Sequence, residues 1–260
     1  SRLMSLRTAL AEQEHSTRNM EDARGFLDAS EGALAKFTDT LQRVRELVIY
    51  GASGTLSDSD RQALADEVDQ LIDELIQTGN ATYANQFLFG GQKTTSRPLE
   101  RKSGTLGEYV EYMGNDKALK WEVAPNVTME ISVAGSKIFK VDGANQSSLF
   151  GTLIQIRDAL RGGSTQDLQD LSGTFLGEID SHIDHFLQLR AVYGAKSNRL
   201  RLALDRNFES KINMTELLSR LEDVDLAKIS MEYSIQQYVY QAALATGAKV
   251  VQPSLVDFLR

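Results

Sequence analysis

A heptad pattern near the C-terminus, from Met214 to Lys249, constrains this chain more than any other feature. Apolar side chains recur there at alternating spacings of three and four residues, the pattern of a helix that packs lengthwise on another helix. No proline interrupts this stripe before Pro253, and lysine can lie along such a stripe with its ammonium in water. The a positions are Met214, Leu221, Lys228, Ile235, Ala242 and Lys249, and the d positions are Leu217, Val224, Met231, Tyr238 and Ala245.

The later part of this predicted helix is apolar on a second side as well. The residues of this second face are Ile229, Tyr233, Gln236, Tyr240 and Ala243. A helix that is apolar on two faces needs more than one packing partner. We therefore predict an interface for assembly with other helices along the heptad stripe. This heptad face consists of Leu221, Val224, Met231, Ile235, Tyr238, Ala242 and Ala245.

Composition limits the classes of partner. The 260 residues are 42% hydrophobic, which is enough for the core of one large or two small domains. A formal net charge of -8, with no basic cluster interleaved with aromatic residues, argues against nucleic acid as a partner. No apolar run is long enough to span a bilayer, so we expect no membrane partner. The absence of cysteine excludes disulfides, thiolate metal sites and cysteine nucleophiles.

The N-terminal segment up to Asn80 predicts a helical hairpin. A strict apolar stripe from Met20 to Val48 predicts a helix that ends at Gly51. Ser57-Asp58-Ser59-Asp60 resembles a capping box, with Asp in place of Glu, at the start of a second helix. Two helices joined by a short glycine-containing loop pack antiparallel to one another.

The segment from Gln92 to about Gln146 predicts a different module. Gly90-Gly91 and Pro98 stop the helical pattern before it, and we expect one small antiparallel sheet. Trp121, the only tryptophan, is expected to fill the core of this sheet rather than mark a ligand site. The β-rich runs are Tyr109 to Tyr112, Ala118 to Val123, Val127 to Val133 and Ile138 to Val141.

Helical periodicity returns at Ser147-Ser148, breaks at Gly162-Gly163 and continues from about Thr165 into the C-terminal heptads. The chain is thus expected to be mainly α with a small β insertion. We predict an elongated antiparallel helical bundle built from both chain ends, plus a small antiparallel β domain. The predicted parts are residues 1–91, the N-terminal arm; 92–146, the inserted β domain; and 147–260, the C-terminal arm that ends in a coiled-coil assembly helix.

The best candidate for chemistry is a group of four polar residues in one predicted helix, Asp180, His182, Asp184 and His185. Two histidines three residues apart can contribute to one metal shell, which leaves open a metal-dependent helical-bundle enzyme that uses His182 and His185. The spacing matches no zinc signature. Our preferred interpretation is that these residues lie on a solvated helix face. We therefore predict no catalytic residue, no bound metal and no cofactor.

Two glycine-rich runs give only weak signals. Gly90-Gly91-Gln92-Lys93-Thr94 lacks the spacing of a Walker loop and follows no buried strand. Gly51-Ala52-Ser53-Gly54-Thr55 lacks the last glycine of a nucleophile elbow and lies between predicted helices. Neither has a histidine nearby that could act as a base. The sequence therefore predicts an architectural protein.

Several of these segments resemble the bacterial flagellin family, which includes the flagellar hook-associated proteins. Arg43 to Val48, followed by Gly51 to Ser57, is similar to the N-terminal helical hairpin of that family. The element around Phe87, Phe89, Gly90 and Gly91 is most similar to the hook-filament junction members of that family. The resemblance continues in the C-terminal helix and ending, in Arg190 to Leu200, Leu221 to Asp225 and Gln252 to Leu259.

The resemblance implies a structural adaptor subunit that joins hook to filament by coiled-coil polymerisation. The implied partners are flagellin-type filament subunits, the adjoining hook-associated protein, further copies of this chain in a ring or helical layer, and an export chaperone. An alternative within the family is a flagellin filament subunit with a small outer domain. The implied location is the extracellular flagellum, reached without a cleaved signal peptide. The sequence starts at Ser1 without an initiator Met, and we expect a preceding segment of the family to be missing.

Overall fold

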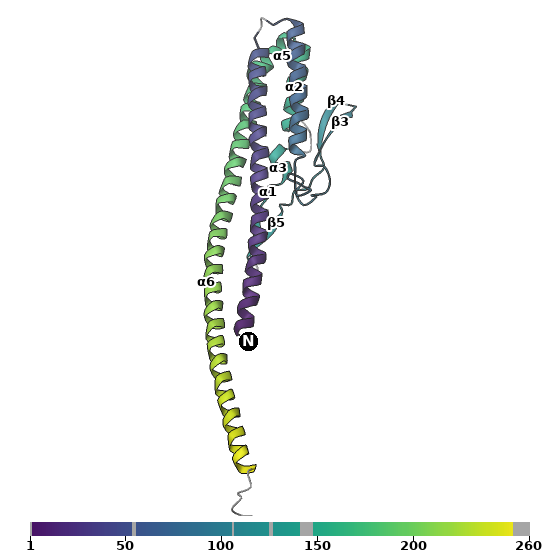
Figure 1. Ribbon diagram of the computed structural model, residues 1–260. Coiled ribbons are helices and arrows are strands. Elements are labelled where there is room, and N and C mark those ends of the chain that lie inside the picture. Colours follow the sequence, from purple (N-terminus) through teal and green to yellow (C-terminus); the bar gives the residue numbers. More distant parts are fainter. Residues whose placement is uncertain (1, 54–55, 106, 125–126, 141–147, 252–260) are drawn as a thin grey trace, which may run out of the picture. The chain divides into compact units, whose positions relative to one another are not determined.

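The computed structural model describes residues 2–53, 56–105, 107–124, 127–140 and 148–251, and for residues 222–227 and 249–251 the backbone alone. Contacts divide the chain into two compact units. One is His15–Asp205, and the other combines Ser1–Glu14 with Arg206–Arg260. Two long helices, α1 (Arg2–Gly51) and α6 (Leu176–Val251), contribute residues to both units (Figure 1). The predicted fold class, mainly α with small antiparallel β elements, is confirmed.

Helix α1 follows the predicted apolar stripe. Its positions Met20, Leu27, Leu34 and Leu41 are all at most 1% exposed, at the spacing of seven that a helix-packing stripe requires. The helix ends at Gly51, where a Cβ atom would collide with the side chain of Leu160. The predicted end at Gly51 is thus correct.

Helix α2 (Asp58–Gly79) begins with the predicted capping box. The Asp60 amide donates to Ser57 Oγ over 3.2 Å, and the Ser57 amide donates to the Asp60 carboxylate over 3.3 Å. These two bonds satisfy backbone donors that a helix start leaves without partners. Helix α2 lies beside α1 and buries Val68, Ile72 and Leu75 (Figure 1).

The β-strands form three separate two-stranded antiparallel sheets, so the predicted single sheet is wrong. The strands are β1 (Thr82–Tyr83), β2 (Gln86–Phe87), β3 (Leu99–Gly104), β4 (Gly107–Tyr112), β5 (Lys120–Ala124) and β6 (Val127–Glu130). Each pair is a hairpin of consecutive strands, and within the described residues no ladder joins one hairpin to another. The expected strands over Tyr109 to Tyr112, Ala118 to Val123 and the start of Val127 to Val133 are present.

The predicted strand over Ile138 to Val141 is also wrong. The short helix α3 (Gly135–Phe139) takes its place, and Val141 lies outside the described residues. Ile138 and Phe139 are adjacent and both buried, at 1% and 0% exposure. Adjacent strand residues point to opposite faces, whereas adjacent helical residues can both face one core.

An aromatic cluster joins the middle segment to the helices. Phe37 of α1 stacks on Phe186 of α6 with ring centres 5.0 Å apart, and Phe139 of α3 lies 5.7 Å from Phe37. Phe89 and Phe150 complete the cluster, at 5.9 and 5.8 Å from Phe139. These rings lie in one continuous core that also includes residues of β4, β5 and β6.

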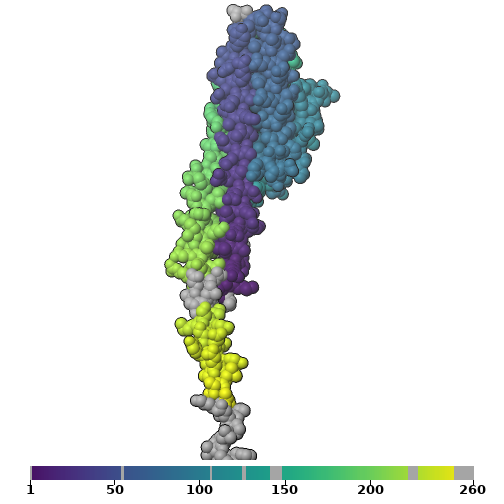
Figure 2. Space-filling view, viewed as in Figure 1, coloured from purple at the N-terminus to yellow at the C-terminus, as the bar shows by residue number. Residues whose placement is uncertain are grey.

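Trp121 does not fill a separate core formed by the strands alone. It is half-buried and packs on Phe26 of α1, with ring centres 6.1 Å apart. The strands therefore cover one side of α1 together with α2, as Figure 2 shows for His15–Asp205. The three-part division at residues 91/92 and 146/147 stays a prediction.

The remaining helices are α4 (Leu149–Gly162), α5 (Thr165–Asp170) and a π-helical turn, η1 (Leu171–Phe175), which leads into α6. Ser148 and Ser164 cap α4 and α5 by accepting from the amides of Gly151 and Asp167. Gly163 ends α4 in a left-handed conformation at φ 63°, which glycine adopts without strain.

A charged network attaches the β3–β4 hairpin to α2 and α4. Arg101 of β3 donates to Asp69 and Asp73, at 2.6 and 2.7 Å. Arg157 of α4, whose side chain is 7% exposed, donates to Asp69 over 2.8 Å and also pairs with Glu108 of β4. Hydrogen bonds from Arg101 and Arg157 lower the pKa of Glu108 to about 2.

Candidate assembly surface

The heptad face of α6 is exposed where its residues are described. Met231, Ile235 and Tyr238 are 66%, 55% and 74% exposed, and Ala242 and Ala245 are exposed as well. Leu221 is half-buried, whereas the side chain of Val224 lies outside the described residues. The structure thus places these residues on one helix but shows no partner for them among the described residues.

The second face of α6 is equally open. Ile229, Tyr233 and Tyr240 are 59%, 63% and 67% exposed. With about 3.6 residues per turn, this face lies on the side of the helix opposite the heptad face. Figure 2 shows this part of α6 in yellow.

The strips between the two faces are narrow and nearly free of charge. Glu232 is the only charged residue between Lys228 and Lys249. Ser234 Oγ bonds the carbonyl of Ser230 over 2.9 Å, within the helix itself. A water-exposed helix normally carries charges around its outer side, so this composition is typical of a helix that becomes covered.

Sequence periodicity missed two members of this surface. Val239 and Leu244 are 63% and 57% exposed, but they fall outside the a and d positions and outside the second face. Their hydrophobicity was the only available signal. Burying one large apolar side chain such as Ile235 contributes roughly 1.5–3 kcal/mol, so covering the whole surface releases several times that amount.

The other predicted motif, around Phe89, has a structural role. Phe89 is fully buried in the aromatic cluster, and Tyr112 Oη donates to its carbonyl over 2.9 Å. Gly91 has φ +66°, and a Cβ atom there would collide with Asn115. Gly90 is also closed in, by the carbonyl of Lys93, while Phe87 is half-buried. This motif shapes a tight loop inside His15–Asp205, so it does not belong to the exposed surface.

The expected solvated histidine face needs a correction. His182 is only 5% exposed, because it follows Ile179 by three residues and precedes Phe186 by four, which places it on the core side of α6. Burial lowers its pKa to about 4, with a smaller effect from Lys140. The prediction for His182 was therefore wrong, although the sequence spacing contained the signal.

The four residues of the metal hypothesis do not converge. Asp180 accepts from Arg45 of α1 over 2.6 Å, and the Nε2–H of His185 donates to the carbonyl of Lys137 over 2.8 Å. Asp184 is exposed. Among the described residues, no group of three or more His, Asp or Glu side chains is placed to hold a metal ion. Nor does any described helix contain a stretch long and apolar enough to cross a membrane.

Models of known protein families match both end segments of the chain. The model of the bacterial flagellin N-terminal helical region matches residues 1–94, and that of the C-terminal helical region matches residues 176–259. The chain belongs to the bacterial flagellin family. The predicted family resemblance is confirmed.

Individual relatives include both hook-associated proteins and flagellins. Flagellar hook-associated protein 3 of Escherichia coli is 28% identical over 94% of this chain and 80% of its own length. Flagellin of Bacillus subtilis is 29% identical over 92% of this chain and 77% of its own length. Identity alone does not separate the two kinds of relative.

Solved structures show the same fold. A putative flagellar hook-associated protein from Vibrio parahaemolyticus superimposes with a TM-score of 0.75 at 22% identity, covering 84% of this chain and 95% of its own. Flagellar hook-associated protein 3 from Legionella pneumophila gives 0.73 at 16% identity, covering 85% and 99%. The overall fold of this chain is thus shared with these proteins.

Proposed function

We propose that this flagellin-family chain is a structural subunit of the bacterial flagellum that joins hook to filament. The observation that carries the proposal is the exposed part of α6, residues 229–248, with two apolar faces and one charge. The relatives named hook-associated protein 3, and the similarity of the Phe89-Gly90-Gly91 element to junction members, favour the junction over the filament.

The proposed mechanism is packing of helix on helix. The heptad face, from Leu221 to Ala245, packs on a helix of a neighbouring subunit, and the second face on another. The neighbours are flagellin-type filament subunits, the adjoining hook-associated protein and further copies of this chain in a ring or helical layer. Before assembly, an export chaperone covers the same apolar faces. The chain is exported from the cell without cleavage of a signal peptide.

A flagellin filament subunit is the second candidate, favoured by the similar identity to the Bacillus subtilis flagellin. Deletion of the gene in its own host separates the two. A junction subunit predicts cells with hooks but no filaments, and with unassembled flagellin in the medium. A flagellin predicts that the major secreted filament protein is itself missing.

We propose no catalytic role for the chain. The metal-dependent alternative required His182 and His185 to share an ion, but His182 is buried and His185 donates to a backbone carbonyl. Elemental analysis of the purified chain, together with motility of a His185→Ala strain, tests this point. Stoichiometric transition metal at these residues, or a hydrolytic activity lost in the variant, contradicts the structural assignment.

The assembly surface is tested by placing one charge on each of two sides of the same helix. Ile235→Asp puts a carboxylate on the heptad face and is expected to abolish filament growth in the complemented deletion strain. Gln241→Asp puts the same group between the two faces and is expected to leave growth nearly intact. Secretion of both variants in equal amounts is the control. Normal filaments with Ile235→Asp contradict the proposed surface.

A further inference from the structure

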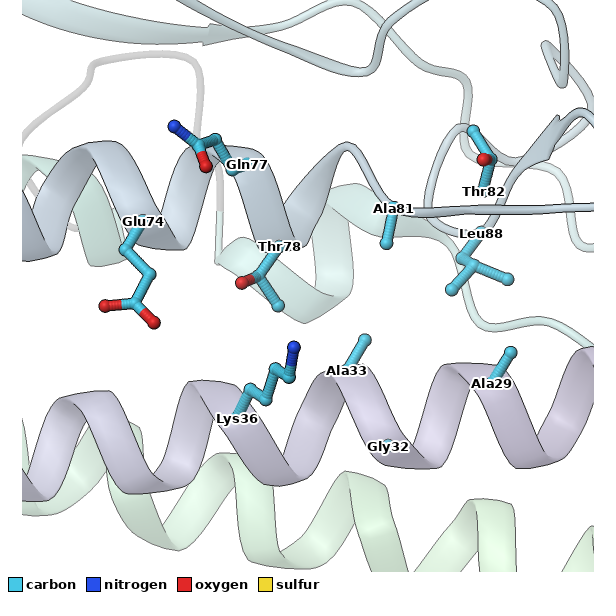
Figure 3. A pocket seen from close by; sticks show the side chains of 10 residues that line it. All are labelled: Ala29, Gly32, Ala33, Lys36, Glu74, Gln77, Thr78, Ala81, Thr82 and Leu88. Atoms are coloured by element: carbon cyan, nitrogen blue, oxygen red, sulfur yellow. The ribbon is translucent and has the colours of Figure 1, made fainter.

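A groove lies between α1 and the end of α2, within His15–Asp205. It encloses about 510 Å³ and is lined mainly by small side chains, with Lys36 and Glu74 at one end (Figure 3). The residues that matter here, called the groove below, are Ala29, Gly32, Ala33 and Lys36 of α1, with Thr78 and Ala81 opposite.

No packing contact among the described residues requires the glycine on the floor of this groove. Gly32 is exposed in the middle of α1, and a Cβ atom there would meet no side chain and no other element within 4 Å. Glycine in a helix interior is less favourable than alanine, and no contact with another described element requires it here. Within the described part of the chain, Lys36 takes part in no ion pair.

The outer side of α6 carries a row of side chains that could fit this groove, because two of them are small, one is apolar and one is acidic. Asp184, Leu187, Ala191 and Ala195 follow one another at spacings of three and four, so they lie on one helix face. All four are exposed, and Leu187 is 46% exposed. Asp184 makes no ion pair with any described residue, although its neighbour in sequence, Asp180, pairs with Arg45. These four residues are called the ridge below.

The groove and the ridge lie at the same level along antiparallel helices. Phe37 stacks on Phe186, and Arg190 donates to Glu31 over 3.0 Å. Because the two helices are antiparallel, a step back from Phe37 corresponds to a step forward from Phe186. One step places Leu187 level with Lys36, and five steps place Ala191 level with Gly32. Figure 3 shows α1 between α2 and α6, so the groove and the ridge lie on different sides of His15–Asp205.

We propose that the groove receives the ridge of a second copy of this chain. A copy placed alongside in the same orientation, without a shift along the helix axis, brings Ala191 over Gly32. It also brings Asp184 within about one helical turn of Lys36, close enough for the long lysine side chain to pair with it. The missing Cβ of Gly32 lets the two helices approach closely.

This contact is heterologous, because each copy uses a groove on one side and a ridge on the other. Repetition of such a contact builds a ring or an open helical layer. The inference deepens the self-association included in the proposed function, but it uses a different surface from the terminal part of α6. The two surfaces can therefore fail independently in experiments.

Disulfide trapping tests the contact cleanly, because the chain contains no cysteine. Mixed Gly32→Cys and Ala191→Cys chains are oxidised and separated on a non-reducing gel. Heterodimers are expected in several-fold excess over both homodimers, and the double variant is expected to form a ladder of oligomers. Val192→Cys, an exposed neighbour off the ridge, replaces Ala191→Cys in the control pair. Equal trapping with the control pair, or homodimers as frequent as heterodimers, overturns the proposal.

A charge exchange gives the second readout. Lys36→Glu in the Gly32→Cys chain and Asp184→Lys in the Ala191→Cys chain are each expected to lower the heterodimer yield several-fold. Mixing the two changed chains is expected to restore it. All trapping is repeated with Ile235→Asp in the background, where the same ladder is expected. Loss of filaments with an intact ladder is the result expected for two independent surfaces. Normal filaments with an intact ladder contradict only the proposed terminal surface, whereas loss of the specific ladder in both backgrounds contradicts only the groove-ridge contact.

Discussion

Two stretches of the same helix, α6, have the same apolar periodicity and opposite surroundings. Ile179, Phe186 and Leu200 are fully buried within His15–Asp205. Met231, Ile235 and Tyr238, farther along, are all more than half exposed. A periodic stripe therefore predicts that a helix face will be covered, but it does not say which molecule covers it.

The difference in exposure indicates that the first stretch of α6 serves folding and the second serves assembly. In the first stretch the covering side chains come from the same chain, as Phe37 of α1 does for Phe186. In the second stretch no described residue of the chain covers the face. Substitutions in the first stretch should lower the free energy of unfolding, whereas substitutions in the second should change assembly and leave the fold intact.

The largest expected effect comes from a matched pair of aromatic truncations. Phe186→Ala should lower the free energy of unfolding by about 3–5 kcal/mol, because it leaves a cavity in the aromatic cluster. Tyr238→Ala, in the same helix, should change it by less than about 0.5 kcal/mol. Urea unfolding followed by circular dichroism measures both. Similar losses of unfolding free energy in the two variants would contradict the proposed difference between the two stretches of α6.

The pH dependence of stability is expected to arise from the buried stretch, through His182. Its pKa falls from an ordinary 6.5 to about 4, so between these values the unfolded chain binds a proton that the folded chain does not. Stability should therefore decrease as pH falls from 6.5 to 4, by on the order of 3 kcal/mol. His182→Gln should flatten that part of the curve. An unchanged slope in this variant contradicts the assignment.

Below pH 4.5 a second loss should follow, from the network around Arg101. The pKa of Glu108 is lowered to about 2, so its contribution is present above pH 4.5 and disappears as pH falls through 2. Glu108→Gln should weaken this second phase while the first remains. The rest of the second phase comes from Asp69, whose pKa Arg157 and Arg101 also lower. The two variants thus separate the histidine window from the carboxylate window. An unchanged second phase in Glu108→Gln contradicts the role of Glu108.

Removal of the buried guanidinium should have a somewhat smaller effect. Arg157→Met leaves Asp69 and Glu108 with Arg101 alone, and should cost about 2–3 kcal/mol of unfolding free energy. Arg220→Met removes an exposed pair with Glu216 in the same helix, and should cost at most about 0.5 kcal/mol. Chemical denaturation distinguishes them, and equal costs mean that burial does not decide the strength of these pairs.

The smallest effect concerns two helical glycines. A Cβ atom at Gly25 would collide with the ring of Tyr83, so Gly25→Ala should destabilise by about 1 kcal/mol despite better helix propensity. Gly194 has open space at that position, so Gly194→Ala should stabilise by about 0.5–1 kcal/mol. Thermal unfolding with opposite shifts in Tm is the expected result. A stabilising Gly25→Ala means that Tyr83 moves aside at little cost.

Sequence reasoning succeeded where local chemistry decides the structure. The capping box at Ser57, the helix end at Gly51 and the stripe from Met20 to Val48 depend on neighbouring residues and on period alone. The heptad face was placed on a helix correctly, although its role in assembly stays a prediction. The family resemblance was found from short motifs and is confirmed by the comparison.

It failed where tertiary packing decides. Ile138 and Phe139 were predicted to lie in a strand. Both side chains are instead buried, Phe139 within the aromatic cluster, and the segment forms a short helix. Three hairpins replace one sheet because each packs against the helices instead of against another hairpin. His182 was assigned to solvent because of its polarity, although its spacing from Ile179 and Phe186 pointed inward.

The central claim is that residues 229–248 of α6 form a surface for assembly, and hydrogen exchange measures it directly. Backbone amides of this stretch are compared in the free chain and in assembled flagella, with residues 179–200 as the internal reference. Exchange across residues 229–248 is expected to slow by several orders of magnitude on assembly, while the reference stretch changes little. Equal protection of residues 229–248 in both states contradicts the claim.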